Sequence, residues 1–229
     1  MTTRKRLVVL TGAGISAESG IRTFRDMGGL WEEYDVMEVA SIDGWKKNPQ
    51  LVLEFYNQRR RQLPTVEPNA AHKALANAQN WFNVFVITQN VDNLHERAGS
   101  QNVLHLHGEL TKARPTGNPS RIIDIGYNDI KWGDTVDGYQ LRPHIVWFGE
   151  EVPMMNEAFK LVQTAEIFAV IGTSLNVYPA AGLLDYAPKD CPIYLIDPND
   201  INIWRRDVTV IKKKASVGVP RFIEMIKNE

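Results

Sequence analysis

Short runs of apolar residues, rich in β-branched side chains, recur along the chain and are separated by longer segments of mixed polarity. A run that is apolar at every position suits a strand buried on both faces, as in a parallel sheet covered by helices. Segments of helical length, the first with Asn69 as a suitable N-cap, lie at residues 69–80, 154–165 and 179–187. This alternation predicts an α/β fold, a Rossmann-like doubly wound parallel sheet, with strands at residues 7–10, 84–87, 103–106, 145–148, 167–171 and 193–196.

Two stretches interrupt this rhythm. Residues 28–64 have helical periodicity without a strand, and residues 111–142 are rich in turn-forming residues. We predict that these two insertions fold together into a smaller lobe, and that a large lobe comprises about 1–27, 65–110 and 143–229. The apolar residues expected to form the core of the second insertion are Ile122, Ile123, Ile125, Tyr127, Trp132 and Tyr139.

Charge and composition narrow the classes of function. Among 229 residues, 26 lysines and arginines stand against 27 aspartates and glutamates, so a nucleic-acid partner bound through its phosphates is not expected. No apolar run approaches the roughly 18 residues of a membrane span, and we expect no membrane partner and a cytoplasmic location. The single cysteine, Cys191, excludes an intramolecular disulfide and a zinc cage of two or more thiolates.

A glycine turn directly follows the first predicted strand. Gly12, Gly14 and Ala17 fit the G-x-G-x-x-A form of a dinucleotide-binding turn, in which glycines let the backbone approach a pyrophosphate. The same pattern also occurs as a tight connection between a strand and a helix, without any ligand. The residues that follow are unusually polar, and Phe24 and Arg25 are candidates for a lid over a ligand.

Polar residues also follow two later predicted strands. Residues 88–93 lie at the carboxyl edge of the sheet, where open α/β folds bind ligands, although Asp92 and Asn93 could instead cap the next helix. His105 and His107 share one face of a strand, but no third zinc ligand stands at a suitable spacing. We expect His107, at the open end, to act as a general base. Structural roles are expected for the remaining histidines, His72, His95 and His144.

The motifs described above, in their order along the chain, resemble those of the sirtuins, the Sir2 family. The resemblance implies a single catalytic domain over residues 1–229 and an NAD-dependent protein-lysine deacylase. Residues 142–150 also resemble the strand with which bacterial sirtuins hold an extended peptide. The other matching segments are residues 12–16 with Gly20, Ile21, Phe24 and Arg25, residues 88–95, residues 105–108, and residues 172–174.

The resemblance implies a role for each matching position. His107 would accept a proton from a ribose hydroxyl, and Asn90 and Asp92 would orient nicotinamide for departure. NAD would be held by Gly12, Ala13, Gly14, Ala17, Phe24, Arg25, Gln89, Asn90, Asp92, Gly172, Thr173, Ser174, Asp197 and Ala215. An acyl-lysine protein or peptide, bound as an added β-strand, would be held by Ala40, Tyr56, Arg59, Val146, Phe148, Gly149 and Glu150.

The sequence departs from the family pattern in two places. Many sirtuins hold a structural zinc with two Cys-x-x-Cys pairs in the segment that matches residues 111–142, which has no cysteine here. We therefore expect this lobe to fold without a metal ion. After the strand at 193–196, Asp197 stands where the family usually has asparagine, and a carboxylate at this place favours NAD over NADP.

The predicted helix around residues 49–63 bears on the choice of acyl group. Tyr56 and Arg59 share one face of this helix with Val52 and Leu63. A boundary arginine that reaches water, with Arg60 and Arg61 as solvated charges, would explain the spacing without a ligand. The Tyr-x-x-Arg pair, however, resembles the carboxylate reader of sirtuins that remove succinyl and malonyl groups, and Ala40 matches a small residue that widens their pocket.

The sequence therefore predicts a deacylase that removes succinyl or malonyl groups, and acetyl groups as well, giving nicotinamide, free lysine and O-acyl-ADP-ribose. One alternative is an ADP-ribosyltransferase or NAD hydrolase that uses the same cleaved ribose. Another is a sensor that binds NAD or ADP-ribose without catalysis. A sensor has no need of a base, so the combination of His107, Asn90 and Asp92 argues against it.

Overall fold

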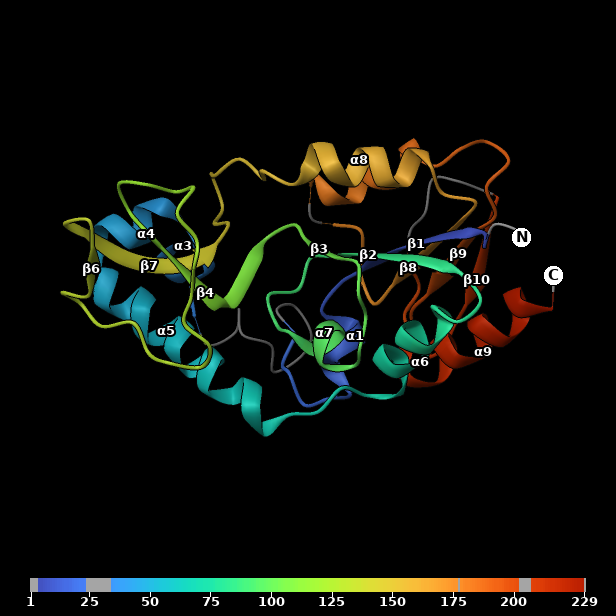
Figure 1. Cartoon of the computed structure of the whole chain (residues 1–229), viewed down its shortest axis with the longest axis horizontal. Coiled ribbons are helices and arrows are strands. Elements are labelled where there is room, and N and C mark those ends of the chain that lie inside the picture. The colour runs from blue at the N-terminus through green and yellow to red at the C-terminus, as the bar shows by residue number, and fades with distance from the viewer. Residues whose placement is uncertain (1–3, 24–33, 177, 202–206, 229) are drawn as a thin grey trace.

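The computed structural model describes residues 4–23, 34–176, 178–201 and 207–228. At its centre lies a six-stranded parallel sheet in the order β10-β9-β8-β1-β2-β3 (Figure 1). The α/β prediction is thereby confirmed. The strands of this sheet are β1 (Arg6–Thr11), β2 (Asn83–Thr88), β3 (Val103–His105), β8 (Ile167–Ile171), β9 (Ile193–Ile196) and β10 (Val208–Ile211).

Successive residues of the central strand β1 face opposite sides of the sheet. Leu7 and Val9 pack in one apolar core with residues of α6 and α9, whereas Val8 and Leu10 pack in another with residues of α8 and η2. Figure 1 shows α8 above the sheet and α6 and α9 below it. Both faces are covered, which explains why the predicted runs are apolar at every position. The covering elements are α6 (Ala70–Ala78), α8 (Met155–Gln163), α9 (Ala215–Lys227) and the 3-10 helix η2 (Ala180–Tyr186).

A smaller lobe lies beside this sheet, at the left in Figure 1. Its antiparallel strands follow the order β5-β4-β7-β6. Tyr56, Leu110 and Trp147 belong to one buried core, so segments far apart in the sequence pack together. Its elements are α3 (Val36–Val39), α4 (Ile42–Lys47), α5 (Pro49–Gln62), β4 (Gly108–Pro115), β5 (Ile123–Asp124), β6 (Thr135–Val136) and β7 (Tyr139–Ile145). The short elements α1 (Gly14–Ala17), η1 (Leu63–Thr65) and α7 (Leu94–Arg97) complete the description.

The prediction of a buried parallel strand at residues 145–148 is wrong. The strand β7 ends at Ile145 and runs antiparallel to β4 in the small lobe. Residues 145–148 are apolar for another reason: Ile145 and Trp147 enter the core of the small lobe, whereas Phe148 is 43% exposed. A run of four apolar residues thus does not by itself distinguish a doubly covered strand from a strand end that packs against a helix.

The predicted core of the second insertion is wrong for four of its six residues, whereas Ile125 does pack against the core of the small lobe. Four of its members are between 41% and 55% exposed, namely Ile122, Tyr127, Trp132 and Tyr139. Leu110, Ala113 and Ile130 are buried in their place, together with residues of α5. Because β5 and β6 have only two residues each, residues 116–138 are otherwise turns and irregular backbone, in which Ile122, Tyr127 and Trp132 stay exposed although Ile130 is buried.

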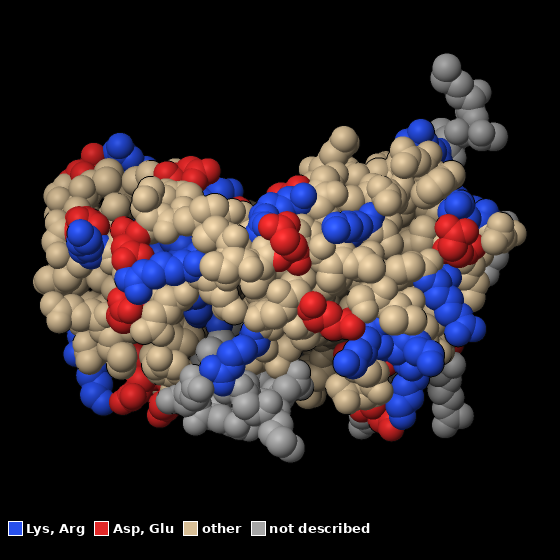
Figure 2. Space-filling view, turned by 90° about the horizontal axis from the view of Figure 1, so that it is seen from below, with Lys and Arg blue, Asp and Glu red and all other residues tan. Residues whose placement is uncertain are grey.

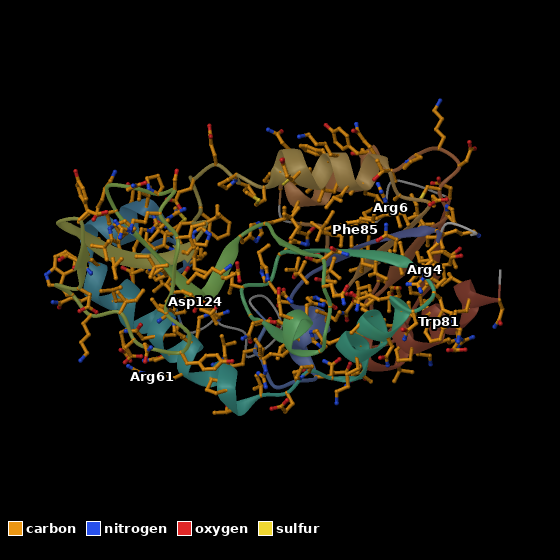
Figure 3. The ribbon with its side chains drawn as sticks, in the orientation of Figure 1. Arg4, Arg6, Arg61, Trp81, Phe85 and Asp124 are labelled. Carbon is orange, nitrogen blue, oxygen red and sulfur yellow. The ribbon has the colours of Figure 1, made fainter. Side chains whose placement is uncertain are left out.

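Charged side chains of both signs lie on the face of the molecule that Figure 2 shows. Basic and acidic side chains are interspersed on the face shown in Figure 2, as the net charge of −1 suggests. At the amino ends of β1 and β2, the guanidinium of Arg6 lies 5.2 Å from the ring centre of Phe85 (Figure 3). Within the described residues, no helix combines the length and apolarity that crossing a bilayer requires.

Candidate active site

One cavity of about 800 Å³ gathers most of the predicted site residues. Its wall is built by loops that follow β1, β2, β8 and β9 at the carboxyl edge of the parallel sheet, and by the small lobe. Asp92 lines a smaller pocket that shares walls with this cavity, while Phe24 and Arg25 lie outside the described residues. The predicted residues in the wall are Gly12, Ala13, Gly14, Ala17, Ala40, Tyr56, Arg59, Gln89, Asn90, His107, Val146, Phe148, Gly149, Glu150, Gly172, Thr173, Ser174, Asp197 and Ala215.

Two glycine-containing loops form one end of the cavity, which we call the glycine end. Gly14 N donates to Gly172 O over 2.9 Å. A Cβ atom on Gly172 would lie 2.4 Å from Ile15 N, and one on Gly12 would lie 2.7 Å from Gly172 O. Gly172 also has a φ of +60°, which favours glycine. The wall here is therefore made of backbone, the surface that a pyrophosphate approaches in dinucleotide-binding folds.

The far side of the glycine end is closed by the segments after β9 and before α9. Asp197, which directly follows β9, is buried and accepts a hydrogen bond from Asn199 N over 2.9 Å. Ala215 begins α9, and the next residue, Ser216, donates from its backbone N and its Oγ to the carboxylate of Glu18 (2.9 and 2.7 Å). This contact fixes α9 against the glycine turn, so the position of Ala215 depends on the loop that it faces.

Side-chain amides lie between the glycine end and the rest of the cavity. Gln89 Nε2 donates to Thr173 Oγ1 over 3.2 Å, which ties the loop after β2 to the loop after β8. Asn90 Nδ2 donates to Gly12 O (3.1 Å) and to Ser16 Oγ (3.2 Å). The Asn90 side chain is therefore held by the glycine turn in one orientation.

Asp92 is 5% exposed and has partners on both carboxylate oxygens. Ser16 Oγ donates to Oδ2 (3.0 Å), and Leu94 N, at the start of α7, donates to Oδ1 (3.1 Å). Burial raises the pKa of Asp92, and these two hydrogen bonds only partly oppose that rise. The sequence left open whether Asp92 caps a helix or lies beside the cavity. The two interpretations are compatible, because Asp92 accepts from Leu94 N at the start of α7 and also lines the smaller pocket.

His107 has a defined tautomer. Its Nδ1 lies 3.0 Å from Gln89 O, and because a carbonyl oxygen only accepts, Nδ1 must carry the proton. Nε2 of the neutral ring is then a proton acceptor. Burial lowers the pKa of His107 from its ordinary value, with the Gln89 carbonyl opposing the change, so the ring is neutral near pH 7. These are properties of a general base.

His105 differs from His107 although both contact the same loop. Its Nδ1 lies 3.0 Å from Asn90 O and its Nε2 lies 2.8 Å from Glu96 Oε1, so both nitrogens donate. Burial opposes a charge on this ring, but the hydrogen bond and charge of Glu96, with Glu109 beyond it, raise the pKa of His105. His107 and His105 therefore donate to the backbone carbonyls of the successive residues Gln89 and Asn90. His107 does so as a neutral ring and His105 as a cation.

Two of the histidines expected to be structural, His72 and His95, are buried, and the third, His144, lies on β7 of the small lobe. His72 Nε2 lies 3.4 Å from Ser16 Oγ, and His95 Nε2 lies 3.1 Å from Thr11 Oγ1. Burial lowers the pKa of His72 to about 4 and that of His95 well below its ordinary value. Both rings are neutral and support polar groups from behind the cavity.

The small lobe forms the opposite end of the cavity, which we call the aromatic end. Tyr56 and Arg59 lie one turn apart on α5, and both line the wall together with Ala40. Burial raises the pKa of Tyr56 to about 12, so its phenol is neutral. Arg59 is half-buried, with its guanidinium 5.5 Å from the ring centre of Phe55, and burial lowers its pKa while Tyr56 and Asp92 oppose this. Arg59 is therefore not a fully solvated boundary charge.

Residues 146–150 line the cavity between its two ends. Val146 N donates to His107 O (2.9 Å) and Phe148 N donates to Ala40 O (2.8 Å), so this segment is joined to both lobes. The partly buried carboxylate of Glu150 is paired, because Arg142 Nη1 lies 2.7 Å from Oε1 and Nη2 lies 3.0 Å from Oε2. Glu150 thus contributes to the wall while its charge is already paired.

Arg60 is a buried residue that the sequence interpretation misplaced among the solvated charges. Its side chain is fully buried, and it donates to Leu110 O (2.5 Å) and Asn57 Oδ1 (2.7 Å). Arg61, one residue later, lies on the outer side of α5 (Figure 3). It pairs with Glu54 and Asp129. A usable signal was present, since Arg60 stands four residues after Tyr56 and so shares its helix face.

Across the ranges that the structure describes, no group of three or more His, Cys, Asp or Glu side chains is arranged to hold a metal ion. The segment 111–142, where relatives with zinc would carry thiolates, has no cysteine. The donor set therefore does not fit a zinc site of that kind, and folding of the whole chain without zinc stays a prediction.

Comparison with known proteins gives consistent matches over nearly the whole chain. The model of the Sir2 family matches residues 12–179. An NAD-dependent protein deacylase of Bacteroides thetaiotaomicron is 54% identical over 229 residues, covering 97% of this chain and 98% of the relative. An NAD-dependent protein deacylase of Helicobacter pylori is 60% identical over 227 residues, covering 96% and 99%. A solved structure of a Sir2 homologue in complex with NAD superposes with a TM-score of 0.86 at 36% identity, covering 98% of this chain and 90% of that one.

Proposed function

Because the chain belongs to the Sir2 family and is an NAD-dependent protein deacylase, we propose that it acts preferentially on lysines that carry succinyl or malonyl groups and also accepts acetyl-lysine. The proposed products are nicotinamide, free lysine and O-acyl-ADP-ribose. The observation that carries this proposal is that Tyr56 and Arg59 line the same cavity as His107. A guanidinium beside a neutral phenol supplies the donors that a terminal carboxylate needs, and an acetyl group offers no such carboxylate.

The glycine end fits the dinucleotide. Its backbone wall, in which a Cβ on Gly12 or Gly172 would collide with the facing loop, suits a pyrophosphate, and the buried Asp197 suits ribose hydroxyls rather than a 2′-phosphate. NAD bound here supplies the ADP-ribose that accepts the acyl group and the nicotinamide that departs. Contacts of NAD with Ala215, and with Phe24 and Arg25 outside the described residues, are further parts of the proposal.

The proposed general base is His107, acting through Nε2. Its Nδ1 proton is engaged by the Gln89 carbonyl over 3.0 Å, which fixes the tautomer that a base requires. The lowered pKa of His107 keeps the base unprotonated at neutral pH. Asn90 and Asp92 are proposed to orient nicotinamide, and their shared partner Ser16 holds both side chains in place.

The proposed peptide site is the rim formed by Val146, Phe148, Gly149 and Glu150. Phe148 is 43% exposed there and Gly149 has a φ of +88°, with open space where a side chain would stand. A substrate segment added along this rim as a β-strand would bring its acyl-lysine between the two ends of the cavity. Folding without zinc, a location in the cytoplasm, and independence of nucleic acid and membranes complete the proposal as predictions from the sequence.

Product analysis tests the proposed function. The purified protein is incubated with NAD and one peptide sequence carrying succinyl-, malonyl- or acetyl-lysine, and the products are identified by mass spectrometry. We expect O-acyl-ADP-ribose from all three and a higher kcat/KM for the succinyl and malonyl peptides. ADP-ribose attached to protein, or free ADP-ribose without loss of the acyl group, would favour the alternatives that the sequence left open. A higher kcat/KM for acetyl-lysine would contradict the proposed acyl preference.

A further inference from the structure

Trp147 is a buried residue with a polar contact to the aromatic end of the cavity. Its side chain is 2% exposed, and its Nε1–H donates to the hydroxyl oxygen of Tyr56 over 3.1 Å. The two rings lie 6.3 Å apart at an angle of 33°. Trp147 lies in the segment 142–150 and lines the cavity, but the proposed roles give its side chain no part in acyl selection.

The hydrogen bond has a consequence for the direction of the Tyr56 hydroxyl group. A phenol has one proton to donate, and its oxygen accepts along directions separate from that proton. With Trp147 donating to the oxygen, the O–H bond of Tyr56 must point away from the indole. The pKa of Tyr56, raised by burial to about 12, keeps that proton in place over the working range of the enzyme.

We propose that Trp147 is a positioning residue for acyl selection, because its indole N–H orients the Tyr56 hydroxyl so that it donates to the carboxylate of a succinyl or malonyl group. This inference rests on the proposed function of Tyr56 and Arg59. The hydrogen bond joins Trp147 to Tyr56, and not to NAD or to the acyl group. In this role Trp147 acts through Tyr56.

The indole is itself held from two sides. The guanidinium of Arg142 lies 3.3 Å from the ring centre of Trp147, and the same guanidinium pairs with Glu150. Trp147 N donates to Glu150 Oε2 over 2.9 Å. On another side, the ring of Trp45 lies 5.4 Å away. A ring clamped in this way cannot turn freely, so the N–H direction is fixed before a substrate arrives.

Glu150 connects this arrangement to the rim where the peptide is proposed to bind. Its carboxylate accepts from Trp147 N and from Arg142, and the residue also lines the cavity. The rim and the aromatic end are therefore joined through one ion pair and one indole. Orientation of the Tyr56 hydroxyl is thus a property of the folded rim, not of α5 alone.

The test is Trp147→Phe, which keeps an aromatic ring in the core and removes the N–H donor. Steady-state kinetics at saturating NAD are measured with succinyl- and acetyl-lysine versions of one peptide. We expect KM for the succinyl peptide to rise about fivefold, with kcat within about twofold and the acetyl peptide nearly unaffected, since one neutral hydrogen bond is lost. Calorimetric titration of the succinyl peptide without NAD should show the same fivefold weakening of binding.

Two further variants separate a positioning role from a packing role. Trp45→Phe changes a neighbouring aromatic of the same cluster, whose contact is with the ring of Trp147, and it should leave the succinyl-to-acetyl ratio unchanged. Tyr56→Phe should lower succinyl activity at least as much as Trp147→Phe, and the double variant should be no worse than Tyr56→Phe alone. Where Trp147→Phe does not fold, Trp147→His takes its place, since its ring returns an N–H and should keep the ratio within about twofold.

The outcomes are distinguishable. Equal losses of succinyl and acetyl activity in Trp147→Phe, or additive losses in the double variant, would overturn the inference and leave Trp147 a packing residue. Loss of the ratio in Trp147→His would do the same. If Tyr56→Phe itself leaves the succinyl preference intact, the proposed carboxylate reader fails, and that result concerns the proposed function before it concerns Trp147.

Discussion

The two ends of the cavity are built from different materials. At the glycine end the wall is backbone, brought so close that Gly12, Gly14 and Gly172 leave no room for a Cβ atom. At the aromatic end the wall is side chain, with Tyr56 and Arg59 presented by one helix. A backbone surface can change little without disturbing the fold, whereas side chains on a helix can be exchanged one at a time. The cofactor end is therefore expected to tolerate no variation, and the acyl end to set specificity.

The largest effect on activity is expected from His107, which lines the cavity together with residues of both ends. His107→Ala removes the proposed base, and we expect deacylation to fall about a hundredfold or more on succinyl and acetyl peptides alike. NAD binding, measured by calorimetry, should be nearly unchanged, and nicotinamide exchange should suffer less than product formation. Near-normal turnover would require another base and would remove His107 from the mechanism.

Arg59→Met breaks the aromatic end alone. The substitution keeps much of the side-chain volume and removes the guanidinium, so KM for the succinyl peptide should rise about tenfold or more while the acetyl peptide is spared or improved. The kcat/KM values for both peptides, on both proteins, decide this. Equal losses on the two peptides would instead support a structural arginine.

Gly172→Ala changes the glycine end alone. The added Cβ would lie 2.4 Å from Ile15 N at a φ of +60°, so we expect the free energy of unfolding to fall by about 1–3 kcal/mol. KM for NAD should rise several-fold, by the same factor whichever peptide is used. Urea denaturation and NAD titrations measure the two effects. Gly182→Ala, where a Cβ meets open space, is the matched control. A change in acyl preference in Gly172→Ala would contradict the separation of the two ends.

The pH dependence sharpens the comparison further. Because burial lowers the pKa of His107 from its ordinary 6.5, the base stays neutral as pH falls below 6.5, and kcat/KM should decline only at more acidic pH. The raised pKa of Tyr56, about 12, lies above this range, so the succinyl-to-acetyl ratio should stay constant from about pH 6 to 9. Profiles for both peptides test this. An acid limb centred above pH 6.5 would contradict the first expectation.

The smallest effect is expected from removing metal ions. With no cysteine in residues 111–142, the small lobe lacks the thiolates of a zinc module. Treatment with a strong chelator should leave the melting temperature and the turnover of both peptides unchanged. Stoichiometric zinc in the purified protein, found by elemental analysis, or unfolding on chelation, would refute the prediction.

The sequence predicted the parallel sheet and the residues around the cavity better than it predicted the small lobe. Strands such as Ile167–Ile171 are buried on both faces, and that environment leaves a continuous apolar signature. Spacing on α5 also placed Tyr56 and Arg59 on one face. Spacing could not show which residues pack against that face. The hydrogen bond between Tyr56 and Trp147 could not be predicted, because the two residues are 91 positions apart in the sequence.

The failures have a common physical cause. In the small lobe the strands β5 and β6 are too short to show alternation, and β10 is an edge strand with partly exposed residues. The three successive arginines after Gln58 look alike in composition, yet a helix turns about 100° per residue and sends them to different surroundings. Only Arg60 among them is fully buried. The local sequence pattern thus predicts in which direction a side chain points from the helix axis, but not which residue it meets there.

The side-chain contacts that hold the small lobe together determine how it should respond to oxidants. Arg60 binds Leu110 O, Asn57 Nδ2 donates to Ile130 O over 2.9 Å, and Arg61 pairs with Asp129. Guanidinium and amide groups of this kind are inert to peroxide, whereas a thiolate cage would be oxidised and would lose its metal. The chain has one thiol, Cys191, and it is buried in the core beside β9, outside the small lobe. Hydrogen peroxide at concentrations that inactivate thiolate-zinc proteins should therefore leave the lobe folded.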